Sequence, residues 1–137
     1  MAGLLLVLLV VASGCQRGEQ DLRGVVQLAA HERGEPAQRA ISLLARAGPA
    51  ALPAIEAGLH AAPPHGRRNL VVALRRLGLI EAVPLLGHLA AFDDDPVVRT
   101  EARFTLGIWV AAGGRRGRAA AAALQKADEV QGSEATG

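Results

Sequence analysis

Few side chains in this 137-residue sequence could carry out chemistry. Beyond position 14 it has two serines, three threonines, one lysine and no tyrosine, and it lacks the phosphate-loop, nucleophile-elbow and zinc-protease motifs. His31 and Glu32 form one isolated pair, and His60 and His65 flank a proline-containing loop without an evident third ligand. The acidic run 93–95 lacks the spacing of a calcium loop and is explained by helix capping and solvation. We expect a protein that is not an enzyme, needs no metal or other cofactor and has no small-molecule substrate.

Arginines provide the sharpest candidate for a binding surface. They recur at spacings of seven or four residues, so that each of three expected helices presents basic groups on one exposed face. A guanidinium group binds carboxylates in a bidentate geometry, which favours an acidic segment of another protein as the partner. An ordinary solvated face is the alternative, because the whole chain has 14 arginines and a single lysine. The candidate protein-binding residues are Arg39, Arg46, Arg68, Arg75, Arg76, Arg99 and Arg103.

The N-terminus contains the one cysteine of the chain. The apolar run from Ala2 to Ala12 is too short to span a membrane, and its length suits the central region of a signal peptide. The residues from Val11 to Cys15 (Val-Ala-Ser-Gly-Cys) resemble a bacterial lipobox. That resemblance implies cleavage before Cys15 and attachment of lipid to its thiol. Two alternatives remain: a soluble secreted protein cut by an ordinary signal peptidase, and a buried N-terminal helix with an incidental cysteine.

An anchor at Cys15 would hold the protein at the cell membrane or the outer membrane, facing the periplasm or the exterior. Only six residues, 15–20, separate it from the first expected helix, a reach of at most about 20 Å. Arg115, Arg116 and Arg118 are a second basic group that could bind anionic headgroups. The net charge of +2 is too balanced for a protein that wraps nucleic acid.

The rest of the chain repeats about every 30 residues. Three similar segments close on Gly48, Gly78 and Gly107, and two further similar segments, 50–59 and 81–89, contain Pro53 and Pro84. Each unit holds two helices joined by short turns, and alanine and leucine supply 41 of the 58 apolar residues beyond position 14. In one segment Leu70, Ala73, Leu74 and Leu77 form an apolar stripe. Asp95 is expected to cap a helix that has Pro96 at its first position.

The sequence of residues 79–107 resembles HEAT repeats of the short type also found in phycobilisome-lyase-like proteins, and residues 49–78 and 21–48 match less closely. Its signature is Ala-Val-Pro-Leu-Leu-Gly-His-Leu, then Asp-Pro-Val-Val-Arg, then Ala-x-x-x-Leu-Gly. The resemblance implies an all-α fold, a short α-solenoid of about three antiparallel helix pairs with a C-terminal capping helix. Ile108 to Ala112 could simply prolong the helix before them, and Trp109 is expected to pack against the cap.

We therefore predict a membrane-anchored envelope lipoprotein that acts as a non-catalytic protein-interaction scaffold. A soluble secreted repeat protein and a protein that binds anionic surfaces are the alternatives. The expected organisation is a signal peptide at 1–14, a lipidated linker at 15–20, a repeat domain at 21–112, a basic loop and capping helix at 113–131, and a disordered tail at 132–137.

Overall fold

A computed structural model describes residue 18 and residues 21–137, and the described chain is helical without strands. Cys15, the expected signal peptide at 1–14 and all of the expected linker except Gly18 lie outside the described residues. After the helical residues 21–31, the helices are α2 (Gly34–Ala47), α3 (Ala51–Leu59), α4 (Pro64–Leu77), α5 (Val83–Phe92), α6 (Pro96–Ala112) and α7 (Gly114–Ala135). Short 3-10 turns at Gly48–Ala50 and Ile80–Ala82 lead into α3 and α5.

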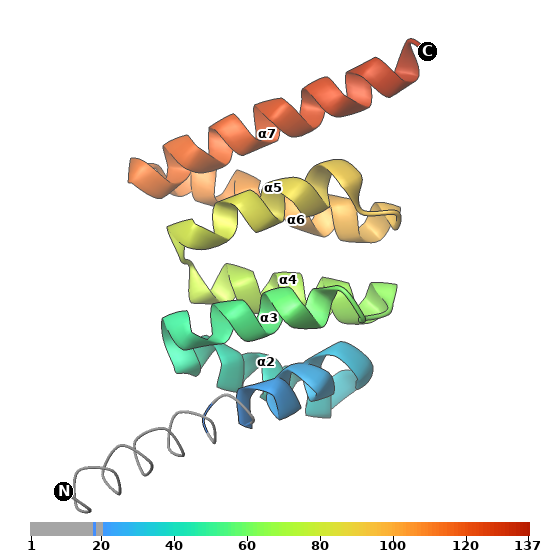
Figure 1. Cartoon of the computed structure of the whole chain (residues 1–137). Coiled ribbons are helices and arrows are strands. Elements are labelled where there is room, and N and C mark those ends of the chain that lie inside the picture. The colour runs from blue at the N-terminus through green and yellow to red at the C-terminus, as the bar shows by residue number, and fades with distance from the viewer. Residues whose placement is uncertain (1–17, 19–20) are drawn as a thin grey trace, which may run out of the picture.

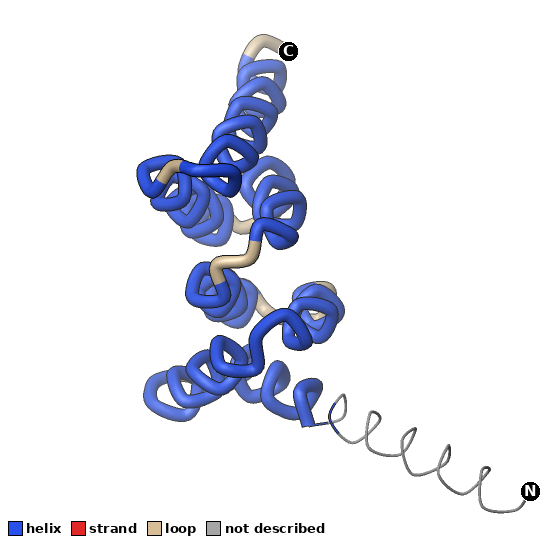
Figure 2. The backbone as a smooth tube through the Cα atoms, turned by 90° about the vertical axis from the view of Figure 1, so that its left-hand side faces the viewer, coloured by secondary structure: helices blue, strands red, loops and turns tan. Residues whose placement is uncertain are grey.

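The helices stack as pairs in two columns (Figures 1 and 2). One column holds α2, α4 and α6, and the other holds helix 21–31, α3 and α5, with α7 crossing over α5 and α6. This is the predicted short all-α solenoid. Because each pair can bury its apolar face only against its neighbours, the stack shares one continuous core.

Local sequence signals define most helix ends. Asp95 Oδ1 accepts the amide protons of Val97 and Val98 at 2.9 and 3.0 Å, which confirms the predicted cap. Gly78 ends α4 in the left-handed conformation, with φ of 65°, which costs little only for glycine. Pro84 lies in the first turn of α5, where no amide proton is needed.

The predicted stripe of α4 is largely confirmed. Leu70, Ala73 and Leu74 are fully buried, while Leu77 is half-buried at the edge of the core. Trp109 is also buried, on α6.

The two ends of the stack differ. At the C-terminal end α6 continues through Gly107 to Ala112, and α7 then packs on α5 and α6 as a cap. α7 begins at Gly114, so the segment expected to be a basic loop lies in its first turns, and the helix runs to Ala135, into the expected tail. The alanines of this segment favour continuous helix. The N-terminal end, formed by helix 21–31 and α2, has no such cap among the described residues.

Candidate functional site

The column of α2, α4 and α6 contains eight arginines and only two carboxylates, Glu35 and Glu101. The structure brings the arginines of α2 and α4 together. Arg76 Nη1 donates to Ser42 Oγ at 3.1 Å, and Ser42 lies one helical turn from both Arg39 and Arg46. We call the group formed by Arg39, Arg46, Arg68, Arg75 and Arg76 the arginine face.

The two carboxylates neutralise part of this face. Glu35 pairs with Arg39 within α2. Glu101 of α6 receives Arg75 Nη1 at 2.7 Å and lies 3.5 Å from Arg68 Nε. Five cations therefore face two anions, and no carboxylate partner of Arg46 or Arg76 is found in the described part of the chain.

An apolar ridge borders the arginine face. Phe104 on α6 is 58% exposed, and the Arg75 guanidinium carbon lies 5.4 Å from its ring centre. Ile108 follows one turn later and is also exposed, as is Val97 two turns before Phe104. The surface thus combines spare positive charge with exposed apolar side chains, which the arginine spacing alone did not reveal.

Arg99 and Arg103 are engaged away from this face. Arg99 Nη1 donates to the backbone carbonyl of Asp93 at 2.6 Å, across the loop that precedes α6. Arg103 is three-quarters buried and pairs with Asp128 of α7. The structure thus gives both arginines internal partners, and the solvent-exposed candidates lie on α2 and α4.

Arg67 forms an ion pair with Asp93 that the sequence did not indicate. Its Nε and Nη2 each donate to Asp93 at 2.9 Å, it also bonds Asp94, and its Nη1 donates to the carbonyl of Ala62 at 3.0 Å. The hydrogen bonds to Asp93 raise the pKa of Arg67 above its usual value, despite the opposing effect of burial. The acidic run thus has two roles. Asp93 links the loop before α6 to α4, and Asp95 caps α6. The 26-residue separation of Arg67 and Asp93 follows no helical periodicity, so only the fold could reveal the pair.

The second basic group lies at the start of α7, at the opposite end of the stack from helix 21–31 (Figure 1). Arg116 is partly buried, with its guanidinium carbon 4.9 Å from the Trp109 ring centre and its Nη1 donating to the Gly78 carbonyl at 2.6 Å. It holds the cap to α6 and to the end of α4. This contact confirms that Trp109 packs against the cap, and it leaves Arg115 and Arg118 as the exposed members of the group.

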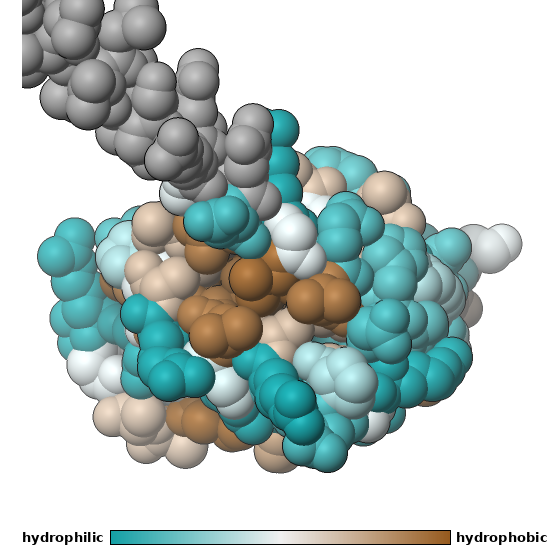
Figure 3. All heavy atoms as spheres, turned by 90° about the horizontal axis from the view of Figure 1, so that it is seen from below, coloured by the Kyte–Doolittle hydropathy of each residue, from teal (hydrophilic) through white to brown (hydrophobic). Residues whose placement is uncertain are grey.

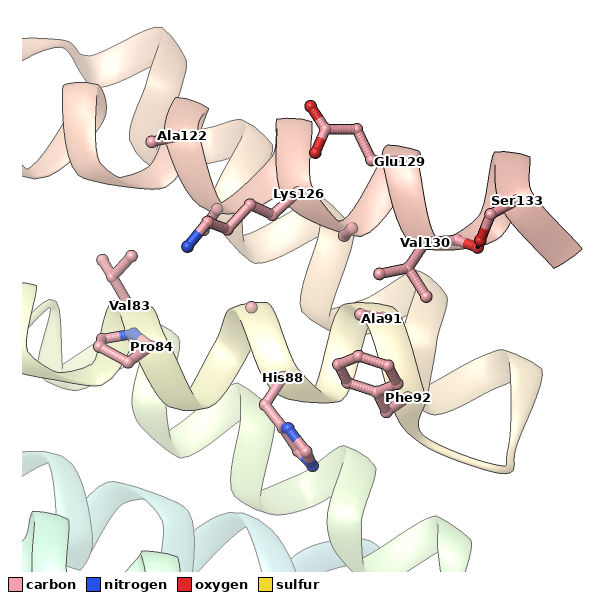
Figure 4. Close-up of a pocket in the computed structure, with 13 residues that line it drawn as sticks. Val83, Pro84, His88, Ala91, Phe92, Ala122, Lys126, Glu129, Val130 and Ser133 are labelled. Atoms are coloured by element: carbon pink, nitrogen blue, oxygen red, sulfur yellow. Dashed lines mark hydrogen bonds between the residues drawn. The ribbon is translucent and has the colours of Figure 1, made fainter.

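An open groove of about 680 Å³ runs between α5 and α7 (Figure 4). Phe92 and Val130 point toward each other across it, Lys126 extends between the two helices, and Glu129 points away. The groove is mostly apolar and could accept apolar side chains of a partner. Within residues 21–137 no three histidine or acidic side chains gather to hold a metal ion. His65 instead contacts Arg33 and the carbonyl of His31.

Comparison with known families agrees with the architecture. A family model described as HEAT repeats matches residues 22–107, which is more than half of the chain. The chain belongs to the HEAT-repeat family. No curated protein and no solved structure matches it. The family match ends where Gly107 was expected to close the third repeat, whereas the last turns of α6 and all of α7 lie beyond it.

The described part of this HEAT-repeat protein contains no helix both long enough and apolar enough to cross a membrane. Its helical scaffold presents the arginine face and the ridge of Phe104 and Ile108 side by side. The likeness to phycobilisome-lyase-type repeats remains a prediction, as does the lipobox.

Proposed function

We propose that this HEAT-repeat protein is a lipid-anchored scaffold of the bacterial cell envelope that binds an acidic segment of another envelope protein, without catalysis of its own. The observation that carries the proposal is the excess of arginine over carboxylate on α2 and α4, next to an exposed apolar ridge on α6. Phe104 and Ile108 lie exposed on α6, and Phe104 lies beside Arg75 of the arginine face. An acidic amphipathic segment would use both the arginines and the ridge.

The residues best suited to contact this partner are Arg46, Arg68 and Arg76. Arg75 is less suitable for a test because it bonds Glu101 and Thr105 and covers Phe104, so replacing it would also disturb the stack. The test is the triple variant Arg46→Glu/Arg68→Glu/Arg76→Glu, compared with Arg115→Glu/Arg118→Glu, which reverses exposed charges at the opposite end. Cross-linking in intact cells identifies the partner, and titration of the purified pair then measures the affinity.

We expect the triple variant to lose about tenfold in affinity, because each exposed charge pair contributes roughly 0.2 to 1 kcal/mol and each reversed charge then repels the acidic partner. Wild-type affinity should fall as salt rises, and the Arg115/Arg118 variant should bind normally. Unchanged binding by the triple variant would show that the arginine face does not bind the partner. Equal loss in both variants would mean that only net charge matters.

The anchor is tested separately at Cys15. Globomycin, which blocks lipoprotein signal peptidase, should leave the leader attached, and mass analysis of the untreated protein should find Cys15 at the N-terminus with acyl chains. A Cys15→Ser chain should carry no acyl chains in the same mass analysis, since the cysteine is the proposed site of attachment. An unmodified N-terminus in untreated cells would instead favour the soluble secreted form.

A further inference from the structure

The N-terminal end of the solenoid exposes apolar side chains that the stack does not cover. Leu28 in helix 21–31 is 48% exposed, and Leu43 in α2 is 47% exposed. Each lies two positions from a fully buried residue, Val26 or Ile41, and therefore on the opposite side of its helix. Figure 3 looks onto this end and shows apolar side chains gathered near its centre, with polar ones around them.

The surroundings of this patch carry mixed charge. Helix 21–31, α2 and the turn between them contain four arginines and three acidic residues, and one arginine, Arg39, already pairs with Glu35. A net positive charge is left beside the apolar centre. The charged residues are Arg23, Arg33, Arg39 and Arg46, and Asp21, Glu32 and Glu35.

The position of the proposed anchor suggests what covers the patch. Cys15 lies six residues before residue 21, where the described solenoid begins, so attached lipid would hold this end within about 20 Å of the bilayer. The group of Arg115 and Arg118, by contrast, lies at the other end of the stack. A membrane that carries the anchor therefore meets helix 21–31 and α2 before it meets α7.

We propose that the surface around Leu28 and Leu43 is a membrane-docking face that rests on an anionic phospholipid bilayer. This inference rests on the proposed anchor. Shallow insertion of the two leucines removes apolar area from water, and the neighbouring arginines attract anionic headgroups. The contact is weak without the anchor, which supplies a high effective concentration of membrane. With this end against the membrane, α2, α4 and α6 stack away from the bilayer. Arg39 and Arg46, within one turn of Leu43 on α2, lie where the docking face meets the arginine face, and the arginines of α4 lie along the side of the stack.

The test uses a chemical tether in place of natural acylation. Cys15 is the one cysteine of the chain, so the mature chain 15–137 can be coupled through it to a maleimide-bearing lipid in vesicles of phosphatidylcholine and phosphatidylglycerol. Starting at residue 15 removes no residue of the described fold. Hydrogen exchange is measured for the tethered protein and for the same protein capped with a small maleimide in solution.

We expect exchange in residues 21–47 to slow by about tenfold on tethering, with α7 unchanged. Leu28→Gln/Leu43→Gln should abolish most of this protection. Phe104→Gln/Ile108→Gln, which changes two apolar side chains of comparable exposure on α6, should keep it. Circular dichroism of both variants checks that they fold, and replacing phosphatidylglycerol by phosphatidylcholine should weaken the protection.

Three results would overturn the inference. They are no protection of residues 21–47 on vesicles, protection of α7 or of the α6 ridge in their place, and protection of residues 21–47 in the untethered protein that increases with its own concentration. The last result would show that a second copy of the chain covers the patch. Because the tether is chemical, these results are independent of whether cells acylate Cys15, so docking and natural anchoring can fail separately.

Discussion

Replacing Arg67 by Met tests the contact that joins α4 to the loop before α6. Methionine keeps an apolar stem of similar length and removes the guanidinium group. The Asp93 carboxylate, whose side chain is 5% exposed, then loses two hydrogen bonds of 2.9 Å. One backbone donor remains to it, the amide of Asp95 at 3.0 Å.

The expected cost follows from this burial. Removing one partner of a buried ion pair destabilises a protein by about 3 to 5 kcal/mol, because the other charge stays buried without compensation. The Asp95 amide still stabilises the carboxylate, so we expect the lower end, about 3 kcal/mol. The neighbouring residue provides a matched control, because Arg68 is 56% exposed and its ion pair with Glu101 is longer, at 3.5 Å. Arg68→Met should cost less than about 1 kcal/mol.

Urea unfolding of chain 15–137 measures both changes. Far-UV circular dichroism follows the helices, and the fluorescence of the buried Trp109 follows the packing of α6. A loss of about 3 kcal/mol should lower the urea midpoint by roughly 1 to 2 M. Adding Asp93→Asn to Arg67→Met should recover about 1 kcal/mol, because the second change removes the stranded charge.

A loss in Arg67→Met no larger than that in Arg68→Met would refute the reasoning. It would mean that Asp93 reaches water or another donor as soon as the guanidinium is removed. An added loss on introducing Asp93→Asn would also contradict it, because the carboxylate would then be stabilising without Arg67.

Further predictions concern glycines and a helix cap. Gly66→Ala should lower the melting temperature by several degrees, because its Cβ would lie 1.9 Å from the Ala30 carbonyl oxygen, and overpacking costs about 1 to 3 kcal/mol. Gly107→Ala should instead stabilise the protein by up to about 1 kcal/mol, because Gly107 lies inside α6 and nothing lies within 4 Å of the added Cβ. If both variants melted at a higher temperature than the wild type, the close approach at Gly66 would be contradicted. Asp95→Ala should cost about 1 kcal/mol in urea unfolding through loss of the cap, and an unchanged midpoint would show that water replaces it.

Much of the fold could be predicted because its signals are local. The stripe containing Leu70 and Leu74, the stop at Gly78 and the cap at Asp95 depend on residues within a few positions of each other. These signals recur about every 30 residues, which is enough to indicate stacked helix pairs. The first turns of α7 were mispredicted because glycine and arginine there resembled a loop, whereas the Arg116 contact with Trp109 and Gly78 holds this stretch against the stack.

The candidate site was only partly predictable. The sequence alone determined that arginines dominate three helices and recur at helical spacing, and that the one cysteine follows an apolar run. Only the tertiary structure decided which arginines remain available, because three of them have partners 25 or more residues away: Glu101 beside Arg75, Asp93 beside Arg67, and Asp128 beside Arg103. Helical periodicity predicts the side of a helix on which a charge lies, whereas packing between repeats determines which opposite charge it meets.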